Sequence, residues 1–203
     1  MYIICSDLEG VFVPEIWVNV AIQTGIDELK LTTRDISDYD ILMKRRLEIL
    51  QQHGITLTDI QKIISGLKPL PGALEFIDWL KSYTQLIIVS DTFTEFADPL
   101  MKQLGRPTLF CHHLTTDNSG HIINYNLRQK DSKRLVTEAL QSLNYKVIAI
   151  GDSYNDISML RKSETGILFN APNKVIQENC DLMTASSYEE LKLIITRIIA
   201  EEK

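Results

Sequence analysis

The chain has 203 residues, of which 44% are apolar and 24% charged, and these proportions are typical of a globular protein. A formal net charge of -6 argues against nucleic acid or an anionic membrane as a partner, because both select a basic face, and no apolar run reaches the length of a membrane span. Three scattered cysteines, Cys5, Cys111 and Cys180, lack metal-type spacing, so we expect reduced thiols in a cytoplasmic protein.

Three short apolar runs are each followed by an aspartate. Continuous apolar runs are typical of parallel strands buried on both faces, and helix-like stretches lie between or after these three. The expected strands are YIICSD (2–7), QLIIVSD (85–91) and KVIAIGD (146–152), and the expected helices are 72–82, 92–104, 131–143 and 153–162. This alternation predicts an α/β fold with a doubly wound, Rossmann-like parallel sheet, in which ligands bind beyond the carboxyl ends of the strands.

Two segments depart from this alternation. Residues 15–68 are helix-like throughout, and we interpret 15–69 as a small helical cap inserted over the mouth of the sheet. The α/β core would then consist of 1–14 and 70–203. Residues 108–127 predict two strands around the turn Asp-Asn-Ser-Gly, which would form a hairpin at the sheet edge.

Asp7 and Glu9 follow the first expected strand, although acids are poor strand formers and costly to bury unpaired. Asp7 could simply cap a turn before Gly10. The functional interpretation places both carboxylates in the mouth of the sheet, one as a nucleophile and the other as a proton carrier. An aspartate nucleophile would form an acyl phosphate and divide a difficult displacement into two easier steps.

The segment GDSYND (151–156) brings Asp152 and Asp156 to the same edge of the predicted sheet. Mg²⁺ favours sites built from one or two carboxylates, several waters and phosphate oxygens. The placement of Asp7 and Asp152 at one edge of the sheet therefore predicts such a Mg²⁺ site. The alternative is that Asp152 caps the following helix and Asp156 favours its first turn.

A hydroxyl and a lysine could hold phosphate. Ser90 ends the second expected strand, beside the N-terminus of the helix expected at 92–104, which suits phosphate binding; a routine N-cap is the alternative. Lys133 falls in the first turn of a later helix, where a cation opposes the helix dipole and a nearby phosphate would explain its presence. A solvated basic face shared with Lys130 is the alternative, and Lys130 is itself a rival candidate.

The cap contains a helix that bears on the substrate. Ser37 or Asp38 can cap it, and it is expected to run to about His53. Arg46 lies in the middle of its apolar stripe, where an arginine usually extends its charged end to the surface. A guanidinium facing a phosphate mouth could instead bind a carboxylate through two hydrogen bonds, and Glu15 could bind an ammonium group or simply favour a first helical turn. The stripe consists of Tyr39, Leu42, Met43, Leu47 and Leu50.

Other residues with catalytic potential have simpler interpretations. Three histidines lack metal-type partner spacing and are expected to be structural or exposed, and both tryptophans fit the apolar faces of helices. These residues are His112, His113, His121, Trp17 and Trp79.

Taken in chain order, DLEGV, IIVSD, DSKR and GDSYND resemble the four motifs of the haloacid dehalogenase-type phosphatases. With VPEIW, TRDISDYDILMKRRLEIL, SDTFTEF and LRQKD, the chain is similar over nearly its whole length to the phosphoserine phosphatase branch, in particular to the bacterial bifunctional phosphoserine phosphatases and homoserine phosphotransferases. The resemblance implies a Mg²⁺-dependent enzyme that forms an aspartyl phosphate, hydrolyses O-phospho-L-serine and can transfer the phosphoryl group to L-homoserine.

The resemblance also implies roles for individual residues. Asp7 and Glu9 would be catalytic; Ser90, Asp91 and Lys133 would bind phosphate; Glu15, Arg46 and Asn155 would bind substrate; and Asp7, Glu9, Asp152 and Asp156 would surround the metal. The wider superfamily mostly has Asp where this chain has Glu9, which leaves the rate of hydrolysis open.

Two other functions remain open at this point. One is a phosphatase for a different small phosphomonoester, and the other is a non-catalytic receiver-like module that keeps phosphate on Asp7. The expected partners are small molecules, with a homodimer left open and no nucleic acid or membrane.

Overall fold

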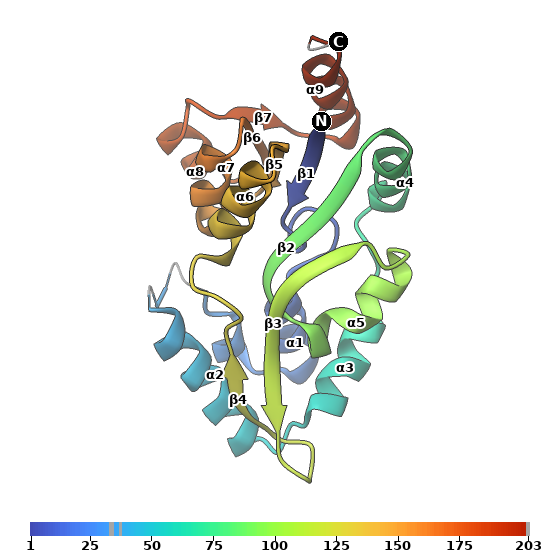
Figure 1. Cartoon of the computed structure of the whole chain (residues 1–203). Coiled ribbons are helices and arrows are strands. Elements are labelled where there is room, and N and C mark those ends of the chain that lie inside the picture. The colour runs from blue at the N-terminus through green and yellow to red at the C-terminus, as the bar shows by residue number, and fades with distance from the viewer. Residues whose placement is uncertain (33–34, 37, 202–203) are drawn as a thin grey trace.

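The computed structural model describes residues 1–32, 35–36 and 38–201 (Figure 1). Its described residues form a seven-stranded sheet in the order β4-β3-β2-β1-β5-β6-β7. Neighbouring strands are parallel except β3 and β4, which are antiparallel. Because the chain leaves β1 toward β2 on one side and returns to β5 on the other, the predicted doubly wound α/β fold is confirmed. The strands are β1 (Tyr2–Ser6), β2 (Gln85–Phe93), β3 (Thr108–Thr116), β4 (Ile122–Asn126), β5 (Lys146–Gly151), β6 (Thr165–Phe169) and β7 (Met183–Ala185).

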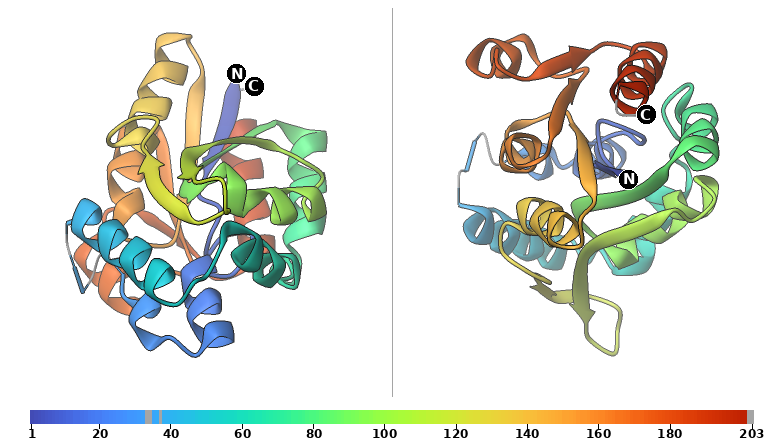
Figure 2. Two further views of the ribbon diagram at one scale, coloured as in Figure 1. Left: turned by 90° about the horizontal axis from the view of Figure 1, so that it is seen from below. Right: turned by 45° about the horizontal axis from the view of Figure 1, so that its top comes forward.

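Helices cover both faces of the sheet (Figures 1 and 2). Successive side chains of a strand point to opposite faces, so Ile4 joins the apolar cluster with α4 and α9, while Ile3 and Cys5 join the one with α6, α7 and α8. These helices are α4 (Ala73–Tyr83), α5 (Thr94–Gln103), α6 (Ser132–Ser142), α7 (Ile157–Lys162), α8 (Asn173–Glu178) and α9 (Tyr188–Ala200), with the short 3₁₀ helix η2 (Tyr154–Asp156) before α7.

The segment between β1 and α4 is helical, as its sequence predicts. It contains α1 (Ile16–Thr24), the 3₁₀ helix η1 (Asp27–Lys30), α2 (Tyr39–Gln52) and α3 (Leu57–Ser65). Asp38 caps α2 by accepting the backbone N–H groups of Asp40 and Ile41, whereas the alternative cap Ser37 lies outside the described residues. Met43 and Ile60 extend the apolar cluster of the core into this segment. The expected cap, residues 15–69, is called the lid from here on.

Two boundaries and one strand pairing differ from the sequence prediction. β2 continues to Phe93 because it pairs with β3 beyond a register shift, so α5 begins at Thr94 and not at residue 92. The stretch 153–162 divides into η2 and α7. The expected hairpin is present as β3 and β4, but β3 is also a parallel partner of β2.

Candidate active site

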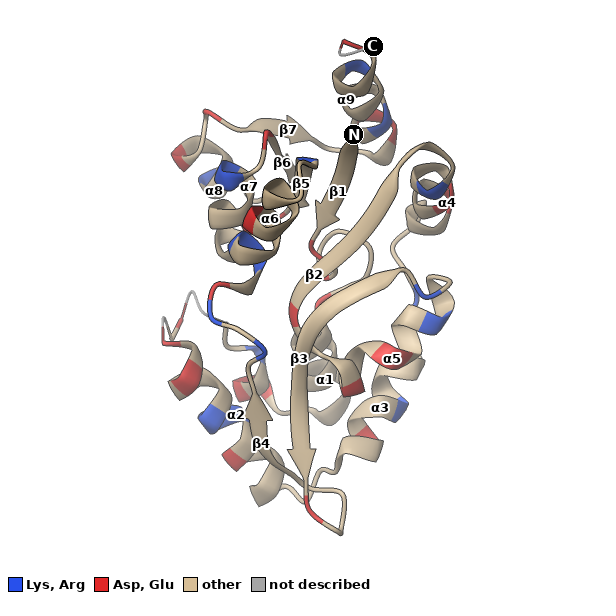
Figure 3. Cartoon of the chain, in the orientation of Figure 1, with Lys and Arg blue, Asp and Glu red and all other residues tan. Residues whose placement is uncertain are grey.

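The carboxyl ends of β1, β2 and β5 meet at a cleft beneath the lid. Asp7 follows β1 directly, its backbone N–H donates to the carbonyl of Ile150 at 2.9 Å, and its side chain is buried, with the residue 4% exposed. Acidic segments mark the ends of β1 and β2 in Figure 3. The cleft has a volume of about 310 Å³ and is lined by Asp7, Glu9, Glu15, Trp17, Val18, Lys30, Thr32, Tyr39, Leu42, Arg46, Ser90, Asp91, Thr92, Lys133, Ser153, Tyr154 and Asn155.

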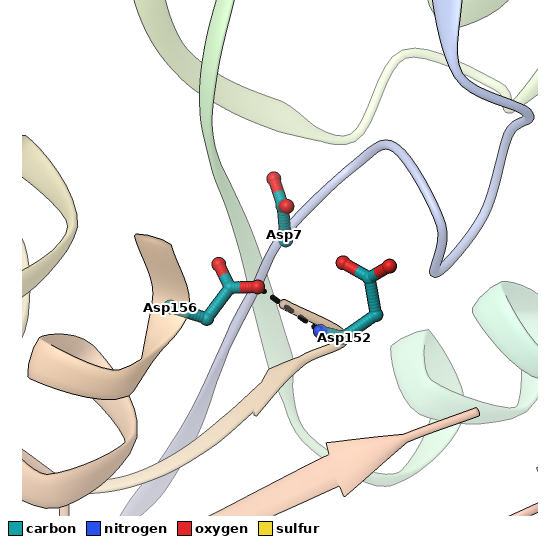
Figure 4. Close-up of side chains that lie close together, drawn as sticks. All are labelled: Asp7, Asp152 and Asp156. Carbon is teal, nitrogen blue, oxygen red and sulfur yellow. Dashed lines mark hydrogen bonds between the residues drawn. The ribbon is translucent and has the colours of Figure 1, made fainter. Parts of the chain in front are cut away.

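Three carboxylates gather where Asp7 lines this cleft (Figure 4). Asp7, Asp152 and Asp156 each offer an oxygen within 4.8 Å of the others. Asp156 is held in place, because its Oδ2 accepts the backbone N–H groups of Asp152 at 3.0 Å and Ser153 at 3.1 Å. An all-oxygen donor set of this kind fits a hard cation such as Mg²⁺.

Two glycines make room for these acids. A Cβ on Gly10 would lie 2.3 Å from Asp152 Oδ2, and one on Gly151 would lie 2.4 Å from the Cβ of Asp156. Gly10 also has a φ of 75°, which L side chains rarely adopt. Glu9 precedes the turn at Gly10, and its Oε2 accepts the backbone N–H of Ile16 of α1 at 2.7 Å. Glu9 therefore lies outside the cluster of three aspartates, although the sequence prediction counted it among the metal ligands.

Lys133 enters the site from the first turn of α6. Its Nζ donates to Asp156 Oδ1 at 2.7 Å and lies 3.0 Å from Asp7 Oδ2. Burial alone would lower the pKa of Lys133, but the surrounding aspartates raise it well above its usual value. The rival Lys130 lines a neighbouring cleft instead. The charge of Lys133 is therefore available to partner a nucleophile or a phosphate.

Burial raises the pKa of three carboxyl groups at or beside the cleft. Burial raises the pKa of Asp7, and the neighbouring Lys133 counteracts this shift. Burial, reinforced by Glu15, raises the pKa of Glu9 to about 7. Burial and the charge of Asp156 likewise raise the pKa of Asp152 to about 7. A carboxyl group with a pKa near neutrality is suited to both accepting and donating a proton.

Ser90 and Asp91 lie within β2 and not at a helix N-terminus. The hydroxyl of Ser90 accepts the backbone N–H of Thr92 at 3.3 Å, and the residue is buried. The expected helix-end environment of Ser90 is therefore wrong, since α5 starts only at Thr94. Asn155 donates its amide to Asp91 Oδ2 at 2.9 Å, so this side chain supports Asp91 at the edge of the cleft.

Arg46 is buried, with only 7% of the residue exposed, so it does not extend its charged end to the surface. Its Nη2 donates to the carbonyl of Leu31 at 2.7 Å, while its Nε has no hydrogen-bond partner among the described residues. Burial lowers the pKa of Arg46 to about 10. Glu15 lines the same cleft, occupies the N-cap position of α1 and does not use its side chain as a cap.

The structure assigns surroundings to the remaining candidates. Trp17 lines the cleft, and the guanidinium of Arg46 lies 4.4 Å from the centre of its ring, so Trp17 is more than a core residue. A helical pattern alone cannot show which face of a short lid helix turns toward the mouth. Trp79 stacks on Phe76, as expected for packing. His112 is buried and hydrogen bonded, which agrees with a structural histidine.

The lid also contacts the hairpin of the core. Tyr125 of β4 donates its hydroxyl to Asp40 of α2, and the Tyr125 ring meets the edge of Tyr39 with centroids 5.9 Å apart. Tyr39 donates its hydroxyl to the carbonyl of Asp91 at 3.2 Å. A second cleft of about 900 Å³ lies beside this contact and shares Asp91 and Lys133 with the first.

Comparison with known sequences identifies the family. The family model described as haloacid dehalogenase-like hydrolase matches residues 12–163, which is more than half of the chain. The chain belongs to the haloacid dehalogenase-like hydrolases. This confirms the resemblance seen in the sequence motifs. Within the described residues, no helix is long and apolar enough to cross a membrane.

Two bacterial relatives of this hydrolase are similar over almost its whole length. It is 58% identical over 192 residues to the phosphoserine phosphatase ThrH of Pseudomonas aeruginosa, covering 95% of this chain and 94% of the relative. It is 56% identical over 190 residues to a phosphoserine phosphatase of Pseudomonas syringae pv. tomato, covering 94% of this chain and 80% of that one.

Solved structures support the fold of this hydrolase. A structure described as a phospho-aspartyl intermediate analogue of phosphoserine phosphatase superposes with a TM-score of 0.76 at 21% identity, covering 95% of this chain and 98% of that one. A phosphoserine phosphatase in apo form gives a TM-score of 0.75 at 22% identity, covering 91% and 94% of the two chains. These similarities bear on the fold alone.

Proposed function

We propose that this hydrolase is a Mg²⁺-dependent phosphotransferase that forms an aspartyl phosphate on Asp7 and hydrolyses O-phospho-L-serine. The observation that carries the proposal is the contact of Asp7 with Lys133 beside Asp152 and Asp156. The names of the two Pseudomonas relatives support phosphoserine as the substrate.

The residues of the cleft divide the reaction into two balanced steps. An Oδ atom of Asp7 forms a bond to phosphorus while the bond from phosphorus to the serine oxygen breaks, and Glu9 gives its proton to that oxygen. In the second step Glu9 takes a proton from water, whose oxygen attacks phosphorus and releases Asp7 and phosphate. The pKa of Glu9, raised by burial to about 7, suits both transfers. The carboxyl group of Glu9 thus acts first as an acid and then as a base.

Other residues would bind the transferred phosphoryl group and offset its negative charge. Lys133 and Ser90 would hold the phosphoryl oxygens, and a metal bound by Asp7, Asp152 and Asp156 would neutralise charge on them. The lid would exclude water from the first step, and the lid residues that line the cleft, Arg46 and Trp17 among them, support this role. That exclusion would also allow an alcohol, L-homoserine, to replace water as the acceptor.

The lid would bind the amino-acid part of the substrate. Arg46 is buried at the cleft beside Trp17, and its guanidinium can pair with the serine carboxylate. Glu15 lies on the same cleft and can accept the ammonium group. These two charges would distinguish a phosphoamino acid from a sugar or nucleotide phosphate.

The test is phosphate release from O-phospho-L-serine with Mg²⁺, with and without L-homoserine, while O-phosphohomoserine is followed. Serine formed in both runs, with phosphate diverted to O-phosphohomoserine in the second, supports the full proposal. Release without transfer leaves a phosphatase. Turnover of other phosphomonoesters but not of phosphoserine contradicts the roles of Arg46 and Glu15, and a stable phosphoprotein without turnover contradicts the enzyme itself.

A further inference from the structure

A buried histidine lies behind the site and has no role in the steps above. His112 is on β3 and is 2% exposed. Its Nδ1 accepts the backbone N–H of Arg128 at 3.0 Å, so this nitrogen carries no proton and Nε2 carries the proton of the neutral ring. The adjacent His113 is exposed and lies 3.7 Å from Glu95. The two neighbouring histidines therefore have opposite environments.

The protonated nitrogen of His112 faces Asp91. His112 Nε2 lies 3.7 Å from Asp91 Oδ1, and Asp91 belongs to the irregular part of β2 where the register with β3 shifts. That distance is longer than a hydrogen bond, and a small rotation of the Asp91 side chain would close it. Contacts in ligand-free sites are often long and tighten when substrate binds.

Asp91 in turn faces Lys133. Its Oδ2 accepts the amide of Asn155 at 2.9 Å and lies 3.7 Å from Lys133 Nζ. Burial acts to raise the pKa of Asp91, but Lys133, His112 and Asn155 together hold it below its usual value. Asp91 is therefore an anion, and its carboxylate is bound by Asn155 and faces Lys133 and His112.

We propose that His112 is a positioning residue, which orients Asp91 so that this carboxylate fixes Lys133 beside the nucleophile. The inference rests on the proposed function, because it concerns the same phosphoryl transfer. Lys133 is already held by Asp156 and Asp7. Asp91 of β2 is the third carboxylate that faces its ammonium group. Partners of this second layer fix the geometry of reacting groups, and displacements of about 1 Å cost on the order of 100-fold in rate.

The rival role for His112 is a purely structural one. Through Nδ1 the ring ties the backbone at Arg128, in the loop between β4 and α6, to the edge of the sheet. The two nitrogens can be separated by substitution. The amide of a glutamine reaches the place of Nε2 and can donate to Asp91, whereas the oxygen of an asparagine takes the place of Nδ1 and can accept from Arg128.

The experiment compares His112→Gln with His112→Asn, with His113→Asn as the matched control. We expect His112→Gln to keep kcat within about threefold of the unsubstituted enzyme and His112→Asn to lower kcat by about 10–100-fold, the range typical of lost second-layer partners. KM should change less than kcat, since the phosphate ligands themselves are unchanged. His113→Asn should match the unsubstituted enzyme. The opposite order, or an equal loss in both variants, overturns the proposal in favour of the structural role.

Two readouts keep this test separate from that of the proposed function. Each variant is assayed on O-phospho-L-serine and on p-nitrophenyl phosphate, so that failure of phosphoserine alone contradicts the substrate while the order of the variants still tests His112. The imidazole tautomer is measured by long-range ¹H–¹⁵N NMR of the unsubstituted protein. A proton on Nε2 supports the proposal, and a proton on Nδ1 overturns it even if a variant fails to fold.

Discussion

At the scale of single residues, the cleft holds the proposed nucleophile Asp7 and the proposed substrate-binding residue Arg46 at different places. Asp7 lies at the end of β1 with Lys133 beside it, and Arg46 lies in the lid above Trp17. Under the proposed function, bond making and substrate choice therefore depend on different side chains, and each should be open to change without the other.

Asp7→Asn should reduce turnover of every phosphomonoester to background. The amide has the shape of the carboxylate but cannot form a stable acyl phosphate, so the covalent step is lost. Phosphate release and trapping of labelled phosphoenzyme both measure this. Turnover retained by Asp7→Asn would rule out the covalent mechanism, and an unchanged far-UV spectrum would show that the loss is not unfolding.

Arg46→Ala should raise KM for O-phospho-L-serine by about 10–100-fold, because hydrogen bonds to a charged group contribute about 1.5–3 kcal/mol. Its KM for p-nitrophenyl phosphate, which has no carboxylate, should change little. Arg45→Ala is the matched control, since Arg45 is exposed and lies 3.6 Å from Glu28. Equal effects on both substrates would show that Arg46 supports the lid and does not bind the amino acid.

At the scale of elements, the turn after β1 packs against the acid that follows the neighbouring strand β5. Gly10 brings this turn against the Asp152 side chain that follows β5. A short turn with a positive φ thus keeps the two acids near each other, and a larger residue there would push them apart.

Gly10→Ala should lower both stability and activity, whereas Gly25→Ala should lower stability alone. Both glycines have positive φ values, 75° and 72°, so both substitutions carry the backbone cost of about 1–2 kcal/mol. A Cβ on Gly10 would lie 2.3 Å from Asp152, but a Cβ on Gly25 has no atom within 4 Å. Urea unfolding and kcat measure the two effects. Full activity in Gly10→Ala would contradict the role of this turn.

At the scale of the whole molecule, the three aspartates store like charge at the meeting point of β1 and β5. Lys133 offsets part of their repulsion, which opposes folding, and a bound cation would offset the remainder. The stability of the entire chain should therefore depend on Mg²⁺.

Saturating Mg²⁺ should raise Tm by about 5–10 °C. A ligand at 100 times its Kd stabilises the folded state by about 2.7 kcal/mol, and a chain of this length gains about 2–4 °C for each kcal/mol. Calorimetry with NaCl of equal ionic strength is the control, and Asp152→Asn should remove most of the shift. A Tm that does not respond to Mg²⁺ would contradict the metal site.

The sequence predicted much of the sheet and its acidic end. Asp7 and Asp152 could be placed together because carboxyl ends of parallel strands share one edge. The strands β6 and β7 were not predicted, since they are short and give no strong periodic pattern. Trp17 faces the cleft and His112 is buried because of the way the lid and β3 pack. The spacing of residues in the sequence carries no information about that packing.

The hairpin of β3 and β4 supports α2 from the side of the core through Tyr125 and Asp40, yet the described hairpin strands carry none of the cleft's clustered aspartates. Substitutions at Tyr125 on β4 should thus alter the contact between the hairpin and α2, while His112 on β3 keeps its place behind Asp91. Under the proposed function, change at β4 is a route by which related enzymes could diverge in substrate while His112, Asp91 and Lys133 stay the same.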